Sequence, residues 1–267
     1  MLDRLFAIDQ VRETIWRLWY PYLTKRLQEK DVLFLNYAFE ELDDATAKLQ
    51  LEPEDEANRF CIQLYHHVAS QVDLAGQRIL EVSCGHGGGA SWVTRTFQPE
   101  RTTALDLNPK GVAFCQERHS LENLNFLQGN AQALPFADES FSAIINVEAS
   151  HCYPDFPGFL AEVHRVLQPG GHFLYADFRF REGFSDWERD ISNCALSIVK
   201  SRDISQEVLR GMNQNASKSL QLVETCLPSF LHSLGRDFAG VPNSKVYDAL
   251  QSGELSYRSW CFRKDPA

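Results

Sequence analysis

Residues 78–97, RILEVSCGHGGGASWVTRTF, contain the pattern that decides the fold. The run RILEVS has the near-continuous apolar character of a strand that is covered on both faces. A glycine-rich turn follows, and GASWVTRTF then has the residue spacing of a helix. Glycines permit a tight turn and let a ligand approach the backbone at the carboxyl end of a strand. The stretch therefore predicts a strand, a nucleotide-binding turn and a helix.

The alternation of strand and helix continues to about residue 180. Apolar runs predict strands at 102–107, 124–129, 141–147 and 172–178, of which 124–129 is the most mixed. Helical spacing is found between them in KGVAFCQERHS and FPGFLAEVHRVL. Two last strands are expected around GRDFAGV (235–241) and SYRSWCFRK (256–264). The pattern predicts an α/β fold with a doubly wound, seven-stranded and mostly parallel sheet.

The chain is predicted to divide into four parts. We expect residues 1–77 to form an N-terminal helical cap, because apolar residues such as Leu2, Leu5 and Ile8 recur at helical spacing. Residues 78–181 would form the core of the sheet. Residues 182–234 are expected to be a helical insertion that forms a lid, and residues 235–267 would supply the last two strands.

Composition excludes several classes of protein. The 267 residues include 26 Lys and Arg against 36 Asp and Glu, a formal net charge of -10. That sign disfavours nucleic acid as a partner, because phosphates attract basic surfaces. No apolar run of about 18 residues is present, so we expect no membrane span and a cytoplasmic location. The 7 cysteines contain no C-x-x-C pair, which predicts reduced thiols and no metal site.

Two acidic residues at predicted strand ends indicate which nucleotide the turn would bind. Glu81, just before the glycines, would repel a pyrophosphate but suits an ammonium or sulfonium group. Asp106 ends the next strand and could accept both hydroxyls of a ribose. Either acid alone could be a solvated turn residue, but the two together with the glycines make that interpretation improbable.

In these residues the sequence resembles the class I S-adenosylmethionine-dependent methyltransferases. Their first motif is an acid followed by alternating glycines, which Glu81, Ser83, Gly85 and Gly87 match, with Ser83 where a glycine is usual. Further similarity lies in G-N-A at 129–131, in L-P-F-x-D-x-S-F at 134–141 and in R-V-L-Q-P-G-G at 165–171. The resemblance implies S-adenosylmethionine as cofactor, held by Tyr37, Glu81, Ser83, Gly85, Gly87, Asp106, Leu107, Asn108, Asn130, Ala131 and Asn146.

Three of these positions have specific expected contacts. Asn130, where the class often has Asp, would meet the adenine edge. Asn146 is the last polar residue of the fourth strand and would face the methionyl part of the cofactor. Tyr37 lies in F-L-N-Y-A-F, which resembles the segment that closes over the cofactor in these enzymes; core packing of its ring is an equal alternative.

A more extended resemblance runs almost from end to end. LEVSCGHGGGAS, NVEASHCYPDF, FLAEVHRVLQPGGHF and GELSYRSWCF are similar to the phthiotriol/phenolphthiotriol dimycocerosates methyltransferase group. That group O-methylates a hydroxyl of a long-chain lipid, and related sequences tailor natural products. The resemblance implies O-methylation of an apolar acceptor without identifying the acceptor.

His151 and Asp177 are the candidate catalytic residues. Transfer to an alcohol requires removal of its proton, and a histidine just beyond the fourth strand, where His151 lies, can accept it. Asp177 ends the fifth strand beside it and could orient the imidazole. A histidine and an aspartate in equivalent motif positions assist deprotonation in the similar sugar O-methyltransferases of indolocarbazole biosynthesis. His151 could instead only line the pocket, and Asp177 could be a cap or an ion-pair partner.

Other functions stay open at this point. Transfer to nitrogen or carbon would leave His151 to shape the pocket, and a non-catalytic cofactor-binding partner would transfer nothing. A nicotinamide dehydrogenase is formally compatible with a glycine-rich turn. The expected acceptor is a small or lipidic hydroxylated molecule, and a homodimer is possible.

The aromatic content, 12% of the residues, suggests where the acceptor would bind. Many aromatic residues lie outside the predicted sheet core, and ligand pockets favour such side chains. We therefore expect an apolar acceptor wall from the N-terminal part and the insertion, although core packing is at least as good an interpretation for any one of them. The residues concerned are Trp16, Trp19, Tyr20, Tyr22, Phe34, Tyr37, Phe39, Phe184, Trp187 and Phe230.

Overall fold

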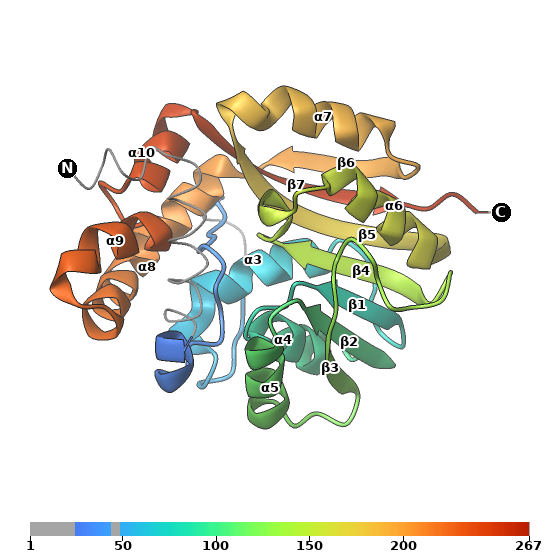
Figure 1. The fold of residues 1–267 in the computed structure, drawn as a ribbon, viewed down its shortest axis with the longest axis horizontal. Coiled ribbons are helices and arrows are strands. Elements are labelled where there is room, and N and C mark those ends of the chain that lie inside the picture. The colour runs from blue at the N-terminus through green and yellow to red at the C-terminus, as the bar shows by residue number, and fades with distance from the viewer. Residues whose placement is uncertain (1–24, 44–48, 267) are drawn as a thin grey trace.

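Seven strands form one sheet in the computed structural model, which describes residues 25–43 and 49–266. Their order across the sheet is β3-β2-β1-β4-β5-β7-β6 (Figure 1). Neighbours from β3 to β5 are parallel, whereas β7 runs antiparallel between β5 and β6. The predicted seven-stranded, mostly parallel sheet is confirmed. Its strands are β1 (Arg78–Val82), β2 (Arg101–Asp106), β3 (Leu124–Gln128), β4 (Phe141–Val147), β5 (Leu167–Phe180), β6 (Ser197–Asp203) and β7 (Leu255–Arg263).

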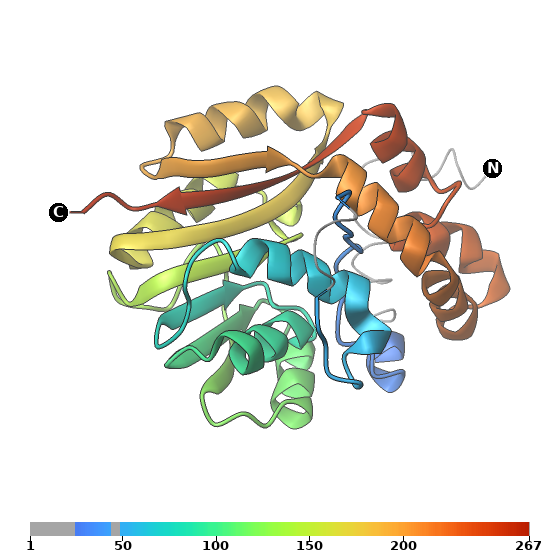
Figure 2. The same cartoon turned by 180° about the vertical axis from the view of Figure 1, so that it is seen from behind.

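Helices cover both faces of the sheet because successive strand residues point to opposite sides. Ile79 and Ile145 belong to the core cluster under α3 (Arg59–Ala69) and α4 (Gly88–Phe97). These two helices lie in front of the sheet in Figure 2. The chain neighbours of the two isoleucines, Leu80 and Ile144, pack in a second cluster, under α6 (Phe156–Val166) and α7 (Phe184–Asn193). A third cluster joins α5 (Pro109–Arg118) to β2 and β3. The central strands are therefore buried on both sides, as their apolar runs predicted.

The parallel register brings the carboxyl ends of the strands to one edge of the sheet. Val82 lies beside Leu105, Asp106 beside Gln128, and Val147 beside Ala176. From β1 the chain continues to β2 and β3 on one side, and β4 then pairs with β1 on the other. Ligands of such sheets bind in the crevice at this change of direction. The crevice between β1 and β4 is therefore the place to look for a site.

The sixth strand is not where the sequence predicted it. Residues 235–241 belong largely to α9 (His232–Ala239), where Leu234 and Phe238 pack on Val223 and Leu227 at helical spacing. The strand is β6 instead, within a stretch expected to be helical. Nearly all of β6 is exposed, because it lies at the sheet edge and pairs only with β7. An exposed edge strand needs no apolar alternation, so its sequence carried no strand signal.

The predicted boundaries at 182–234 and 235–267 are consequently wrong. The first range contains a strand of the core, and the second contains two helices and one strand. Three helices lie between the last two strands, α8 (Ser205–Cys226), α9 and α10 (Lys245–Ser252), and they gather at the carboxyl end of the sheet (Figure 1).

The aromatic wall expected over the cleft is largely absent from the described residues. Phe39 and Trp187 are each 2% exposed and belong to core clusters, and Phe34 is also buried. Phe230 is 79% exposed at the surface. Among the named aromatics in the described ranges, Tyr37 contacts Phe178 beside the candidate catalytic residues, and the Trp187 ring packs against the guanidinium of Arg179. Trp16, Trp19, Tyr20 and Tyr22 lie outside the described residues, as do Leu2, Leu5 and Ile8.

Candidate functional site

The glycine turn after β1 requires its glycines. Gly85 and Gly87 have φ angles of 57° and 76°, a left-handed conformation that favours glycine. A Cβ on Gly87 would lie 2.7 Å from the ring of Phe126, and one on Gly85 would lie 3.1 Å from Leu35. The turn is thus closely covered by β3 on one side and by the N-terminal segment on the other.

Asp106 lies beside this turn and is held by backbone groups. Its Oδ2 accepts a hydrogen bond from the Gly85 amide at 2.9 Å, and its Oδ1 accepts one from the Asn108 amide at 2.9 Å. Burial raises the pKa of this carboxyl, although these hydrogen bonds oppose the shift. Each oxygen keeps a lone pair for a further donor, such as a ribose hydroxyl.

The neighbouring predicted residues have distinct local roles. Leu107 is 65% exposed, an open apolar surface at the end of β2. The Asn108 side chain accepts from the Lys110 amide and caps α5. Asn130 accepts from the Gln132 amide through Oδ1, and Ala131 is buried.

Glu81 is buried beneath the turn, with a partner that sequence reasoning missed. It is 3% exposed, and its Oε1 accepts a hydrogen bond from the Tyr65 hydroxyl at 2.8 Å. Burial raises the pKa of Glu81 to about 8, against the effect of that hydrogen bond. Tyr65 lies on α3, whose apolar spacing predicted a helix but gave no reason to single out one tyrosine.

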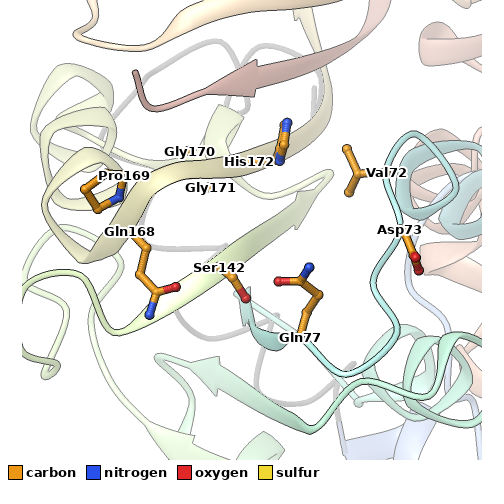
Figure 3. Close-up of a pocket in the computed structure, with 9 residues that line it drawn as sticks. All are labelled: Val72, Asp73, Gln77, Ser142, Gln168, Pro169, Gly170, Gly171 and His172. Atoms are coloured by element: carbon orange, nitrogen blue, oxygen red, sulfur yellow. The ribbon is translucent and has the colours of Figure 1, made fainter. Parts of the chain in front are cut away.

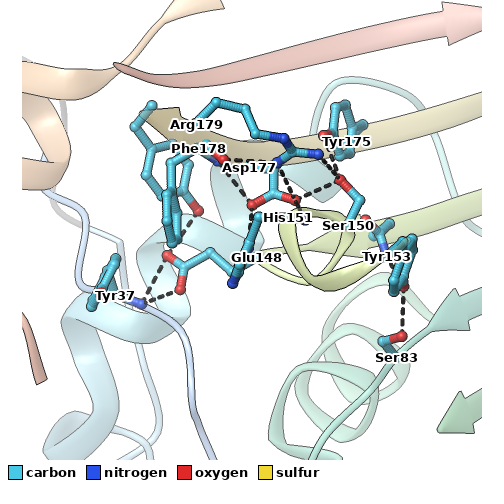
Figure 4. A network of polar contacts seen from close by, with 12 residues as sticks. Tyr37, Ser83, Glu148, Ser150, His151, Tyr153, Tyr175, Asp177, Phe178 and Arg179 are labelled. Carbon is cyan, nitrogen blue, oxygen red and sulfur yellow. Dashed lines mark hydrogen bonds and ion pairs between the residues drawn. The ribbon is translucent and has the colours of Figure 1, made fainter. Parts of the chain in front are cut away.

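Ser83 and Asn146 meet in the crevice between β1 and β4, and Tyr153 joins them. The Ser83 Oγ lies 2.5 Å from the Tyr153 hydroxyl oxygen (Figure 4). Asn146 Nδ2 donates to the same oxygen at 3.1 Å. Asn146 is fully buried and also donates to the Val82 carbonyl. Sequence reasoning missed Tyr153 because no local pattern relates it to strand β1.

His151 and Asp177 are brought together as predicted. His151 lies in a short turn, η2 (Ser150–Cys152), and its Nδ1 is 2.8 Å from Asp177 Oδ1. The Asp177 side chain is 0% exposed, whereas that of His151 is 27% exposed. Partial burial opposes a charged imidazole, but the adjacent carboxylate dominates and raises the pKa of His151 to about 10. The ring also stacks on Phe178, with centroids 4.3 Å apart.

Several groups that the sequence did not indicate surround Asp177. Its Oδ2 accepts from the Ser150 hydroxyl at 2.6 Å and from the His151 amide at 2.9 Å. Arg179 Nη1 lies 3.2 Å from the same oxygen. Burial alone would raise the pKa of Asp177, but His151 and Arg179 hold it well below its usual range. Asp177 is therefore an ionised carboxylate that fixes the imidazole ring.

Glu148 connects this cluster to the N-terminal segment. Both of its carboxylate oxygens accept from the Tyr37 amide, at 2.9 and 2.8 Å, and the Tyr257 hydroxyl donates to Oε1 at 2.8 Å. The Tyr37 ring lies 5.7 Å from that of Phe178 (Figure 4). Burial raises the pKa of Glu148 to about 8. Tyr37 thus lies next to the candidate catalytic pair, held there through its backbone.

Two cavities lie away from these residues. One of about 330 Å³ is lined by residues such as Gln77, Ser142 and His172, at the opposite end of the strands (Figure 3). In the described part of the chain, no group of three His, Cys, Asp or Glu side chains could hold a metal ion. Within the same residues, no helix is long and apolar enough to cross a membrane.

Comparison with known proteins identifies the family. Residues 80–175 match the family model described as a methyltransferase domain. A phthiotriol/phenolphthiotriol dimycocerosates methyltransferase of Mycobacterium leprae is 52% identical, over 94% of this chain and 92% of its own. A fatty-acid O-methyltransferase of Mycolicibacterium smegmatis is 45% identical, over 96% of this chain and 92% of its own.

A solved structure supports the same fold. A geranyl diphosphate C-methyltransferase from Streptomyces coelicolor, crystallised with S-adenosyl-L-homocysteine, superposes with a TM-score of 0.68 over 94% of this chain and 97% of its own, at 18% identity. The chain therefore belongs to the class I S-adenosylmethionine-dependent methyltransferases. Within that class it belongs with the phthiotriol/phenolphthiotriol dimycocerosates methyltransferase group, as its motifs predicted.

Proposed function

We propose that this protein transfers a methyl group from S-adenosylmethionine to a hydroxyl of an apolar lipid or secondary metabolite. His151 is the general base, and Asp177 orients it. The observation that carries the proposal is the 2.8 Å contact between Nδ1 of His151 and the fully buried Asp177. Because Nδ1 is occupied, Nε2 is the nitrogen left to accept a proton. The lipid acceptor of the Mycobacterium leprae relative supports the choice of substrate class.

The residues at the strand ends suit successive parts of the cofactor, taken in order across the sheet. Asn130, Ala131 and the exposed Leu107 suit the adenine near β3 and β2. Asp106 suits the ribose, because its oxygens can accept further hydrogen bonds. The glycine turn and Asn146 would then take the amino-acid end. When bound, S-adenosylmethionine supplies an electrophilic methyl group and leaves as S-adenosylhomocysteine.

The protein's own task is to produce a nucleophilic oxygen. His151 Nε2 takes the proton of the acceptor hydroxyl as that oxygen attacks, and the imidazolium formed is stabilised by Asp177. The raised pKa of His151, about 10, makes its neutral form a strong base but a minor one at neutral pH. Activity toward an alcohol should therefore rise with pH until His151 is deprotonated. Tyr37 and Phe178 provide an apolar surface beside the base.

A fatty-acid carboxylate is a second candidate acceptor, favoured by the charges of the cluster. His151 and Arg179 are two cations around the single buried carboxylate of Asp177. A carboxylate acceptor is already ionised and needs no base, so a charged His151 would hold it instead. The 45% identical relative is named as a fatty-acid O-methyltransferase.

Matched acceptors separate the two candidates. Initial rates of wild type and His151→Gln would be measured with hexadecanol and palmitic acid between pH 6 and 10.5, with product mass confirming O-methylation. For the alcohol, we expect a rate that rises with pH in the wild type and falls at least about 100-fold in the variant. For the acid, the wild-type rate should instead decrease as His151 loses its charge.

An alcohol rate that is unchanged in His151→Gln would refute the base assignment. Binding of S-adenosylhomocysteine, measured by calorimetry, should stay within about three-fold of wild type, because His151 is not assigned to the cofactor. A product methylated on nitrogen or carbon from an acceptor that offers those atoms, with no turnover of either O-acceptor, would overturn the proposal in favour of that chemistry.

A further inference from the structure

Tyr153 occupies the crevice between β1 and β4 without a role in the chemistry so far described. It lies between η2 and α6, and its ring packs edge-on against Phe159 with centroids 4.9 Å apart. Its hydroxyl oxygen is 2.5 Å from Ser83 Oγ and 3.1 Å from Asn146 Nδ2. The hydroxyl therefore bridges the ends of the two strands that border the crevice.

Ser83 adopts a backbone conformation that disfavours a side chain. Its φ angle is 61°, in the left-handed region that glycine enters at no steric cost. In exchange, the serine side chain shares a hydrogen bond with the Tyr153 hydroxyl. Persistent strain of this kind is concentrated at functional sites, which indicates that the pair has a functional role.

Asn146 shows what the pair holds in place. Its Nδ2 donates to the Val82 carbonyl at 2.9 Å and to Tyr153, so the amide plane is fixed from the β1 side. Its Oδ1 is buried and has no hydrogen-bond partner among the described residues. A buried acceptor without a donor is unfavourable, and in native proteins such atoms call for an explanation. A ligand with an N–H group would supply the missing donor.

The position of this acceptor identifies the part of the ligand that it meets. Asp106 ends β2 and Asn130 follows β3, so ribose and adenine lie on that side of β1. Asn146 lies one residue before the end of β4, on the opposite side of β1. The remaining part of the cofactor, its amino-acid end with an ammonium group, is therefore the part that reaches Oδ1.

We propose that Ser83 and Tyr153 are a positioning pair that orients Asn146 so that its Oδ1 accepts a hydrogen bond from the ammonium group of the cofactor. The inference depends on the proposed function only through the cofactor, not through the acceptor or His151. Tyr153 acts here through Asn146.

Two ligands that differ only at the amino-acid end test this assignment. Calorimetry would compare S-adenosylhomocysteine with 5′-methylthioadenosine, which keeps the adenosine and sulfur but lacks the amino acid. In Tyr153→Phe and Ser83→Gly we expect S-adenosylhomocysteine affinity to fall about ten-fold, the equivalent of one hydrogen bond. Affinity for 5′-methylthioadenosine should change by less than about two-fold. The double variant should bind no more weakly than the worse single variant, because the two residues act as a unit.

Ser83→Ala is the matched control for backbone strain. It lacks the hydroxyl like Ser83→Gly but keeps a Cβ at a positive φ. The affinity for S-adenosylhomocysteine should therefore fall by the same factor in both variants. Only Ser83→Gly should become more stable in thermal unfolding. Equal weakening of both ligands, multiplicative effects in the double variant, or unchanged S-adenosylhomocysteine affinity would each overturn the proposal. None of these outcomes depends on turnover, so failure of the methyl-acceptor assignment is separately visible.

Discussion

The two halves of the sheet edge hold their acidic side chains in different ways. At the β2 end, Asp106 is satisfied by the backbone amides of Gly85 and Asn108. At the β4 and β5 ends, Glu148 and Asp177 are held chiefly through side chains and segments distant in sequence. The first half uses backbone amides of the turns that follow β1 and β2, whereas the second half uses side chains and, through Tyr37, a segment 111 residues away. The comparison predicts that substitutions at the β4 and β5 ends disturb more of the surrounding residues than substitutions at the β2 end.

The sharpest test of this comparison exchanges one acid in each half for its amide. Asp177→Asn should lower the turnover number on the order of 10³–10⁴-fold, because the imidazole loses the carboxylate that orients it and that stabilises the imidazolium formed when it takes the proton. Asp106→Asn should instead weaken S-adenosylhomocysteine binding about ten- to one hundred-fold. Steady-state rates at saturating cofactor and calorimetry separate the two effects. Equal losses of affinity in both variants would remove the distinction between the halves.

Asp177→Asn should also lower thermal stability, whereas Asp106→Asn should change it much less. The buried Asp177 compensates Arg179 and His151, and removal of one member of such a group leaves charge uncompensated. Circular dichroism at the assay temperature verifies that both variants are folded when the rates are compared.

The ion pair between His151 and Asp177 should make the stability of the protein depend on pH. The pKa of His151 in the folded protein, about 10, lies above its usual 6.5. Its contribution to stability is therefore complete below pH 6.5 and is lost as the pH rises through 10. We expect the difference in unfolding free energy between wild type and His151→Gln to be largest near pH 6 and to shrink toward pH 10. Urea titrations at several pH values measure it, and a constant difference would contradict the ion pair.

Glu148 should have a smaller effect on the pH dependence of stability. Burial raises its pKa from 4.5 to about 8, so its contribution to stability falls as the pH rises through 8. Glu148→Gln cannot ionise, and its stability relative to wild type should increase from pH 5 to pH 9. The apparent Michaelis constant for the cofactor should rise by about three- to ten-fold, because Tyr37 loses one carboxylate acceptor. A wild-type Michaelis constant in this variant would show that the segment around Tyr37 does not contribute to binding.

The smallest effect is expected at a cap in the first half. The Asn108 side chain accepts from the Lys110 amide at the start of α5. Asn108→Ala should lower the unfolding free energy by about 1 kcal/mol, the usual value of such a cap. Affinity for S-adenosylhomocysteine should fall by less than about three-fold, since the backbone amide that binds Asp106 remains. A larger loss of affinity would mean that the Asn108 side chain itself meets the cofactor.

The same division explains what could be predicted about the site. Gly85 and Gly87 act through their own turn, and Asp106 lies at the end of a strand that its apolar run predicts, so local patterns were enough to identify them. His151 and Asp177 were identified because two strand ends meet at one edge of any parallel sheet. Arg179 and Tyr153 were missed because their partners come from other elements. The strand β6 was missed because an exposed edge carries no apolar pattern.

The sequence by itself determined the class of fold, the glycine turn and the pairing of His151 with Asp177. The first two follow from periodicity and from the residues of a single turn, and the pairing follows from the expected parallel sheet, whose strand ends meet at one edge. Only the tertiary structure decided that Glu148 binds the Tyr37 segment and that Tyr153 bridges Ser83 and Asn146. It also decided the pKa values of His151 and Glu148, because burial and the approach of distant charges set them.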